Sequence, residues 1–304
     1  MPRRFLLSFA LVAVGLSSSE AQAGTYDLNL TRLGSVSGSG VPTGDDAAFR
    51  SVASELGVLM APKPVDSADS LGLSAFAISA DFSVNSLSNT ADFWTKTTGG
   101  ASGTGSTPGK FAPTMQIMGR KGLWPGIEVG AGATHLFNSR MWTFGGYGKV
   151  ALHEGFHHLP IPSIALRGSF ARLVGAQDMN MTTGSFDVSI SHVFGVGKTF
   201  NITPYVGYQA LMVFARSSVL DITPGTDEYL EGSSGPNEFV FKDAGFIMRH
   251  RPFIGARFIF SVLRLGLEAM VVPGGGRAGS IDGKEIKDSS GLQQQYTLSL
   301  GLDF

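Results

Sequence analysis

The feature that most constrains this chain is a hydrophobic period of two residues, which recurs in short stretches from residue 72 to the C-terminus. In residues 72–84, "GLSAFAISADFSV", apolar side chains alternate with Ser79, Asp81 and Ser83. Successive side chains of a β-strand point to opposite faces, so this pattern predicts a strand with one apolar face. The same alternation marks residues 126–137, 142–152, 163–170, 185–194, 201–210, 252–262, 263–271 and 294–304. The sequence therefore predicts an all-β chain.

The composition agrees with a strand-rich protein. Of the 304 residues 15% are charged, and 41 are glycine and 22 phenylalanine, which suits strands better than helices. The chain has no cysteine, which excludes disulfides and thiolate metal sites, and its formal net charge of −1 gives no reason to expect a nucleic-acid partner. A soluble periplasmic β-sandwich would alternate as well, but polar second faces on strands of about ten residues favour an antiparallel transmembrane β-barrel. We predict about ten strands, within a range of about 8 to 14, and a short N-terminal helix.

The first 23 residues have the features of a cleaved signal peptide. Arg3 and Arg4 precede an apolar stretch at residues 5–16 that is too short to span a bilayer. Ala21 and Ala23 form an A-x-A cleavage site. We therefore expect residues 1–23 to be removed as the protein leaves the cytoplasm.

A single helical pattern follows. Residues 45–62 place Phe49, Val52, Leu56 and Leu59 at helical spacing after two aspartates that can cap the N-terminus. We predict an amphipathic helix within an N-terminal segment, residues 24–66, that lies in the periplasm or plugs the lumen. Residues 67–304 are then expected to form the outer-membrane barrel.

The last strand carries a recognisable feature. One of its faces holds Tyr296, Leu298, Leu300, Leu302 and Phe304. This pattern resembles the C-terminal strand of bacterial outer-membrane proteins, whose terminal aromatic residue is read by the barrel-assembly machinery. The resemblance implies that outer-membrane lipid and this machinery are partners of the chain, and that the five residues act as an assembly signal.

A broader resemblance covers most of the mature chain. Residues 49–79 and 139–175 resemble an uncharacterised family of Gram-negative outer-membrane β-barrel proteins with a myxobacterial character. The resemblance implies a fold and a location but no catalytic residues. Some such barrels belong to multi-protein envelope complexes, including motility machines, so other envelope proteins are expected as partners.

The expected lumen face carries charges of both signs. They are Asp81, Glu128, Lys149, Arg167, Asp187, Arg257 and Glu268. A barrel this narrow has little open interior, and a low dielectric environment penalises unpaired charge. We expect these residues to pair in a lumen charge network, although a polar channel or a proton-linked site remains open.

Two short motifs invite an enzymatic interpretation that their context opposes. His153, Glu154 and His157 spell the H-E-x-x-H pattern of zinc proteases, which requires a helix, but Gly155 and two prolines make a strand end and a turn more fitting. The stretch "GVGKT" at 195–199 lacks the first glycine of a P-loop and lies between two strands, as a hairpin turn would. We predict no catalytic residues, no bound metal and no cofactor.

The lengths of the connections between strands predict which end of the barrel faces out of the cell. Long connections near 85–110, 215–245 and 274–290 are expected outside the cell, and short ones near 154–162, 195–198 and 263 in the periplasm.

The function favoured is a non-enzymatic outer-membrane barrel that is a structural or assembly component of an envelope complex, in motility or export. A small porin-like channel for solutes or hydrophobic molecules is the alternative, and a barrel-embedded hydrolase ranks last.

Overall fold

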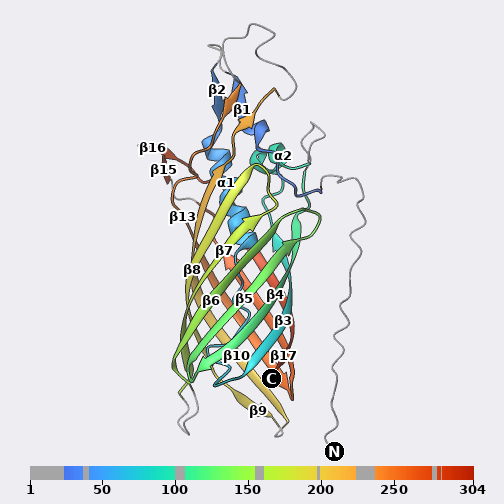
Figure 1. The fold of residues 1–304 in the computed structure, drawn as a ribbon, viewed down its shortest axis with the longest axis vertical. Helices are drawn as coiled ribbons and strands as arrows, with labels where there is room; N and C mark the ends of the chain where they lie inside the picture. The colour runs from blue at the N-terminus through green and yellow to red at the C-terminus, as the bar shows by residue number, and fades with distance from the viewer. Residues whose placement is uncertain are drawn as a thin grey trace, which may run out of the picture.

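Ten strands of the described chain close into one antiparallel barrel (Figure 1). The computed structural model describes residues 24–36, 41–99, 107–154, 161–196, 199–223, 237–275, 279–281 and 283–304, so the expected signal peptide lies outside the described residues. The wall strands are β3 (Phe76–Ser86), β4 (Phe111–Trp124), β5 (Ile127–Leu136), β6 (Trp142–His153), β7 (Ser163–Val174), β8 (Met179–Ser191), β10 (Phe200–Ser217), β13 (Ile247–Phe260), β14 (Leu263–Val272) and β17 (Gln293–Asp303). Pairing of β10 with β13 and of β17 with β3 closes the ring. The predicted fold class is confirmed.

The two ends of the barrel differ in their connections. At one end, called the turn end here, only residues 125–126 join β4 to β5 and only 261–262 join β13 to β14. At the opposite, loop end, residues 87–110, 218–246 and 273–292 make the long connections. Figure 1 shows the C-terminus and β9 (Phe194–Val196) at the turn end, and the small accessory elements at the loop end.

The accessory elements sit above the wall. They are η1 (Leu30–Leu33), β1 (Gly34–Val36), β2 (Pro42–Gly44), α2 (Asp92–Thr97), β11 (Leu220–Asp221), β12 (Glu238–Phe239), β15 (Gly279–Ile281) and β16 (Lys284–Ile286). Strands β1 and β2, β11 and β12, and β15 and β16 form separate hairpins. The long connections therefore carry structure of their own.

Strand β4 is a wall strand that the sequence patterns above did not name. Its buried inward residues include Thr114, Gln116, Met118 and Arg120, in strict alternation. Its outward face includes Gly119 and the exposed Lys121, which interrupt the apolar pattern that marks the other strands. The period of two was present, but hydrophobicity alone did not reveal it.

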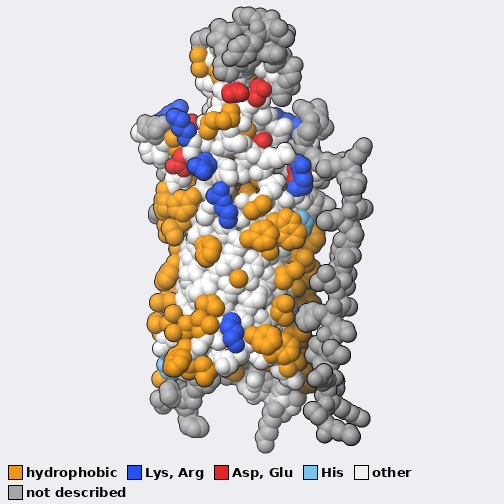
Figure 2. Space-filling view, in the orientation of Figure 1, with side chains coloured by type: hydrophobic (Ala, Val, Ile, Leu, Met, Phe, Trp, Pro, Cys, Tyr) orange, Lys and Arg blue, Asp and Glu red, His pale blue; other side chains and the backbone are white. Residues whose placement is uncertain are grey.

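The outer surface of the wall is apolar and is bounded by aromatic residues at both ends. Leu267, Leu298 and Leu300 are exposed between the two ends. Exposed aromatics at the turn end are Phe76, Trp124, Phe194, Phe200, Phe260 and Phe304, and those at the loop end include Phe111, Trp142, Phe214 and Phe246. In Figure 2, most charged side chains gather at the loop end, above a wall of apolar and small residues. An apolar band between two aromatic girdles is the surface of a barrel that contacts lipid.

Helix α1 (Asp46–Met60) lies within the loop-end half of the barrel (Figure 1). Asp45 caps it by accepting a hydrogen bond from the Ala48 N–H at 3.0 Å. All residues from Phe49 to Met60 are buried, so beyond its first turn the helix has no solvent-facing side despite its polar residues. Among the described residues, no helix has both the length and the apolar character needed to cross a membrane.

Candidate functional site: the plugged lumen

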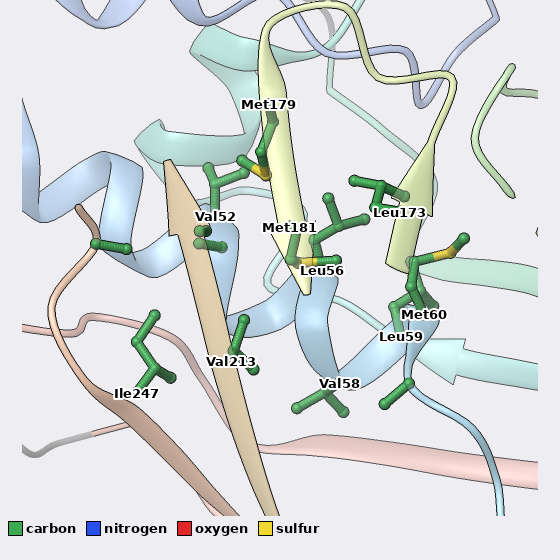
Figure 3. Close-up of a cluster of buried hydrophobic side chains, with 14 of the residues drawn as sticks. Val52, Leu56, Val58, Leu59, Met60, Leu173, Met179, Met181, Val213 and Ile247 are labelled. Carbon is green, nitrogen blue, oxygen red and sulfur yellow. The ribbon is translucent and has the colours of Figure 1, made fainter. Parts of the chain in front are cut away.

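The loop-end half of the lumen is filled by a cluster of buried apolar side chains around α1 (Figure 3). Val52, Leu56 and Leu59 are fully buried. Wall side chains of the same cluster, several of which Figure 3 labels, include Leu173 of β7, Met179 and Met181 of β8, Leu211 and Val213 of β10, and Ile247 of β13. Each buried side chain of this kind stabilises the fold by about 1.5–3 kcal/mol. The helix is thus held in the barrel mainly by apolar packing.

One glycine allows the helix to approach the wall. A Cβ added to Gly57 would lie 2.5 Å from the Val213 Cγ2 atom, well inside van der Waals contact. At the loop end of the helix, the Phe49 ring stacks on Phe241 with centroids 4.5 Å apart. These contacts fix how α1 sits against β10 and the β10–β13 connection.

The polar side of α1 is bonded to the loops that cover it. The fully buried Glu55 carboxylate accepts hydrogen bonds from the Trp94 Nε1–H at 2.7 Å, the Ser88 N–H at 3.1 Å and the Gly291 N–H at 2.9 Å. Arg249 of β13 donates to the Ser54 and Ser290 hydroxyls, each at 2.7 Å. These bonds join the helix, the wall and two long connections, and they give the Glu55 carboxylate and the Ser54 and Ser290 hydroxyls hydrogen-bond partners.

Arg50 extends the same pattern to the start of β13. Its guanidinium donates to the carbonyl oxygens of Ala244 at 2.7 Å and Phe246 at 2.9 Å. A bidentate guanidinium contact of this kind fixes direction as well as distance. The N-terminal half of α1 is therefore tied to the connection between β10 and β13.

Residues 61–75 continue from α1 toward the turn end and belong to no strand. Wall side chains accept hydrogen bonds from the main chain of this segment. Gln116 accepts from the Lys63 N–H at 3.1 Å, and Glu268 from the Val65 N–H at 2.9 Å. Ser191 accepts from the Ala68 N–H at 3.0 Å, and Glu128 from the Leu71 N–H at 3.0 Å. We call α1 and residues 61–72 together the plug.

Asp66 is the centre of the polar half of the plug. Its buried carboxylate lies 3.3 Å from Arg120, 3.0 Å from Lys149, 3.3 Å from Arg257 and 2.9 Å from Arg264. These cations come from β4, β6 and the neighbouring strands β13 and β14. One plug carboxylate therefore bonds to four wall strands at once, and Asp69 adds a second ion pair to Arg257.

The structure places all seven of the charged residues singled out in the sequence inside the barrel, each buried. Two wall-to-wall pairs form across neighbouring strands. Arg167 lies 2.9 Å from Asp187, and Lys149 lies 3.2 Å from Glu128. Arg257 instead pairs with the plug aspartates.

Asp81 and Glu268, the other two of the seven, bond to uncharged groups. Asp81 accepts hydrogen bonds from Gln116 at 3.2 Å and Ser299 at 2.5 Å. Glu268 accepts from the Tyr205 hydroxyl at 3.1 Å as well as from the Val65 N–H. The lumen thus contains ion pairs and neutral hydrogen bonds together, rather than a chain of paired charges.

Sequence reasoning missed the residues at the centre of the network. Arg264 stands in alternation with Leu263 and Leu265, so the period of two could have placed it inside. Arg120 could have been found with β4. Asp66 and Asp69 lie in "PVDSADS", a stretch with no period. Nothing in that local pattern indicates that the stretch passes through a barrel.

The five residues of the expected assembly signal lie on the outward face of β17. Their exposed fractions run from 36% at Leu302 to 54% at Tyr296 and Phe304. The Phe304 ring stacks on Phe76 at 4.8 Å, and the main chains of the two residues exchange hydrogen bonds of 2.8 and 2.9 Å. The first and last wall strands therefore meet at the turn end, beside lipid-facing side chains.

Glu154 of the H-E-x-x-H stretch bonds to the plug near the turn end. His153 ends β6, and Glu154 accepts a hydrogen bond from the Ser70 N–H at 2.9 Å and bonds to the Ser70 hydroxyl as well. His157 lies outside the described residues. In the described part of the chain, no group of three or more His, Asp or Glu side chains is arranged to hold a metal ion. Near the second motif, β9 pairs with the start of β10 as a hairpin.

Comparison with known proteins finds distant structural similarity to solved outer-membrane proteins. No family model and no curated protein matches the chain. Among solved structures, the attachment invasion locus protein Ail of Yersinia pestis is similar at 10% identity and a TM-score of 0.26, over 76% of this chain and 99% of that one. The outer-membrane protease OmpT of Escherichia coli is similar at 7% identity and a TM-score of 0.32, over 76% and 96%. The transport unit of the Escherichia coli autotransporter AIDA-I is similar at 10% identity and a TM-score of 0.35, over 86% and 98%. At these sequence identities and TM-scores, the fold assignment rests on the strand pairing described above. No role of these proteins is assigned to this chain.

Proposed function

We propose that this chain is a non-enzymatic integral outer-membrane β-barrel, closed by its own N-terminal segment, that serves as a structural or assembly component of a cell-envelope complex. The apolar band between aromatic girdles supports placement in a bilayer, where a closed barrel leaves no strand edge unpaired. Export by a cleaved signal peptide and short turns on the periplasmic side are part of the proposal.

The plug is the observation that supports a closed lumen. Apolar packing around α1 fills the loop-end half, and residues 61–72 run through the turn-end half, bonded to its wall. A solute would have to displace both. The outward face of β17 is the surface proposed to meet the barrel-assembly machinery, and the structured loop end is the surface proposed for other envelope proteins.

Planar-bilayer recording tests the closed state against the porin-like alternative. Purified, heat-modifiable protein should insert without step conductances at ordinary voltages. Uniform steps in every preparation, which scale with the number of inserted barrels, would favour the porin-like channel and refute the closed barrel.

A test of the enzymatic alternative needs a matched variant. Incubation with peptide and lipid-ester substrates should give no turnover above that of a Glu154→Gln variant. Turnover that disappears in Glu154→Gln, with heat modifiability retained, would place chemistry at the turn end and overturn the non-enzymatic proposal.

A further inference from the structure

The segment that precedes α1 lies at the loop end of the barrel. Its backbone is bonded to three different connections there. The Tyr26 N–H donates to Asn138 at 3.1 Å, the Asn29 N–H to Thr97 at 2.8 Å, and the Leu30 N–H to the Asp178 carboxylate at 2.8 Å. These partners belong to the β5–β6, β3–β4 and β7–β8 connections.

Side chains strengthen this attachment. Asp27 pairs with Arg140 at 3.2 Å and also accepts the Arg140 N–H at 2.8 Å. The Tyr26 hydroxyl donates to the Phe111 carbonyl at 2.8 Å, and burial raises the pKa of this phenol. Residues 24–36 and 41–45 are thus a built part of the loop end.

From this position the chain crosses the whole barrel before its first wall strand begins. Helix α1 occupies the loop-end half, and residues 61–75 run on to the turn end, where Phe76 opens β3 beside the C-terminal Phe304 (Figure 1). Where the chain leaves the lumen, a Cβ on Gly122 would lie 1.8 Å from the Gly72 carbonyl oxygen, so the wall is shaped to the passing segment. Residues 24–36 and 41–45 therefore lie at the end of the barrel opposite the C-terminus.

We propose that the barrel carries its own N-terminal segment through its lumen and displays residues 24–36 and 41–45 on the outer surface of the cell. The inference rests on the proposed outer-membrane placement, with the short turns in the periplasm. A segment with unpaired backbone groups cannot cross lipid, so the lumen is the route open to it. The turn-end half of that route is lined by polar side chains of the wall, among them Ser189, Ser191, Thr203, Gln209 and Thr297.

The contacts of the plug explain how the N-terminal segment would stop at one position as it passes through the lumen. Residues 61–72 are held by wall side chains through hydrogen bonds that water can replace one at a time, so they can form and break during passage. Asp66 reaches its four cations at one position, and at that position α1 buries its apolar residues. The two sets of contacts together fix how much chain is displayed.

Cysteine labelling tests the display directly, because the chain contains no cysteine of its own. Ser35→Cys and Thr43→Cys place thiols at exposed positions of the β1–β2 hairpin. Lys242→Cys marks the β10–β13 connection at the loop end, and Ser261→Cys marks a short turn at the turn end. An impermeant maleimide is applied to intact cells and, in parallel, to cells with a permeabilised outer membrane.

The expected result is full labelling of the Ser35, Thr43 and Lys242 variants on intact cells, and labelling of the Ser261 variant only after permeabilisation. Labelling of Lys242→Cys on intact cells while both hairpin variants stay protected would overturn the display and leave the barrel placement standing. Labelling of Ser261→Cys with protection of Lys242→Cys would reverse the barrel and overturn both. Heat-modifiable gel mobility of each variant shows that the protein compared is folded.

An epitope fused between Ala23 and Gly24 gives a second readout. External protease should remove the epitope from intact cells while the barrel stays intact. An epitope that survives until the outer membrane is permeabilised would overturn the display, whatever the labelling of the hairpin.

Discussion

Replacement of Asp66 by asparagine is the most direct test of how the plug is held. The change removes one negative charge and keeps the side-chain size, so it leaves four buried cations around a neutral amide. At separations near 3 Å each pair has roughly 5 kcal/mol of gross attraction at an effective dielectric constant of about 20. Desolvation of the ions offsets much of that gain, and removal of one partner from a buried pair typically costs about 3–5 kcal/mol.

The remaining contacts show which cation is affected most. Lys149 keeps Glu128 at 3.2 Å, Arg257 keeps Asp69, and Arg264 keeps Asp303 at 3.9 Å. Arg120 keeps a hydrogen bond to the Ser79 hydroxyl at 3.1 Å. We therefore expect Asp66→Asn to lower the free energy of unfolding by about 3–5 kcal/mol, with Arg120 carrying much of the uncompensated charge.

Denaturant unfolding in detergent micelles, followed by the loss of heat-modifiable mobility, measures this change. The double variant Asp66→Asn with Arg120→Met removes the least compensated cation and should recover about 1–3 kcal/mol relative to the single variant. Asp92→Asn is the matched control, because Asp92 is 89% exposed and its pair with Lys96 is 3.9 Å long. An Asp66→Asn protein as stable as the Asp92→Asn protein would refute the argument that Asp66 anchors the plug.

Further predictions concern packing, assembly and the H-E-x-x-H stretch. Gly57→Val should destabilise the barrel by about 1–3 kcal/mol in the same unfolding assay, because α1 has no room beside Val213, while Ala47→Val on the partly exposed first turn should change little. Phe49→Ala should cost about 3–5 kcal/mol through loss of the buried ring and its stack on Phe241. Deletion of Phe304 should slow membrane insertion, Leu302→Ala should act likewise and Asp303→Ala less so, as pulse-chase gel shifts would show; equal insertion rates would count against an assembly role for this face. Glu154→Gln should change stability by no more than about 0.5 kcal/mol, because its amide oxygen can still accept from Ser70, and replacement of His153 and His157 should leave the zinc content of purified protein unchanged.

Local periodicity was enough to predict most of the wall strands and the character of their two faces. Each wall strand repeats every two residues whatever its neighbours are, so Asp81, Glu128 and Arg167 could be placed inward from the sequence. Strand β4 escaped because Gly119 and Lys121 weaken its outward pattern, although its inward residues alternate as strictly as those of other strands. The helix at α1 was also predictable, since spacing and capping are local properties.

What surrounds those elements was decided by the tertiary structure alone. The sequence predicted a helix with one polar face, yet closure of ten strands around α1 buries that face too, against Arg249 and the loop that holds Trp94. Asp66 lies in a stretch without period, and its four partners come from strands separated by as many as 198 positions in the chain. Its role follows from where the ring of strands brings those cations, because electrostatic attraction depends on distance in space and not on distance along the sequence.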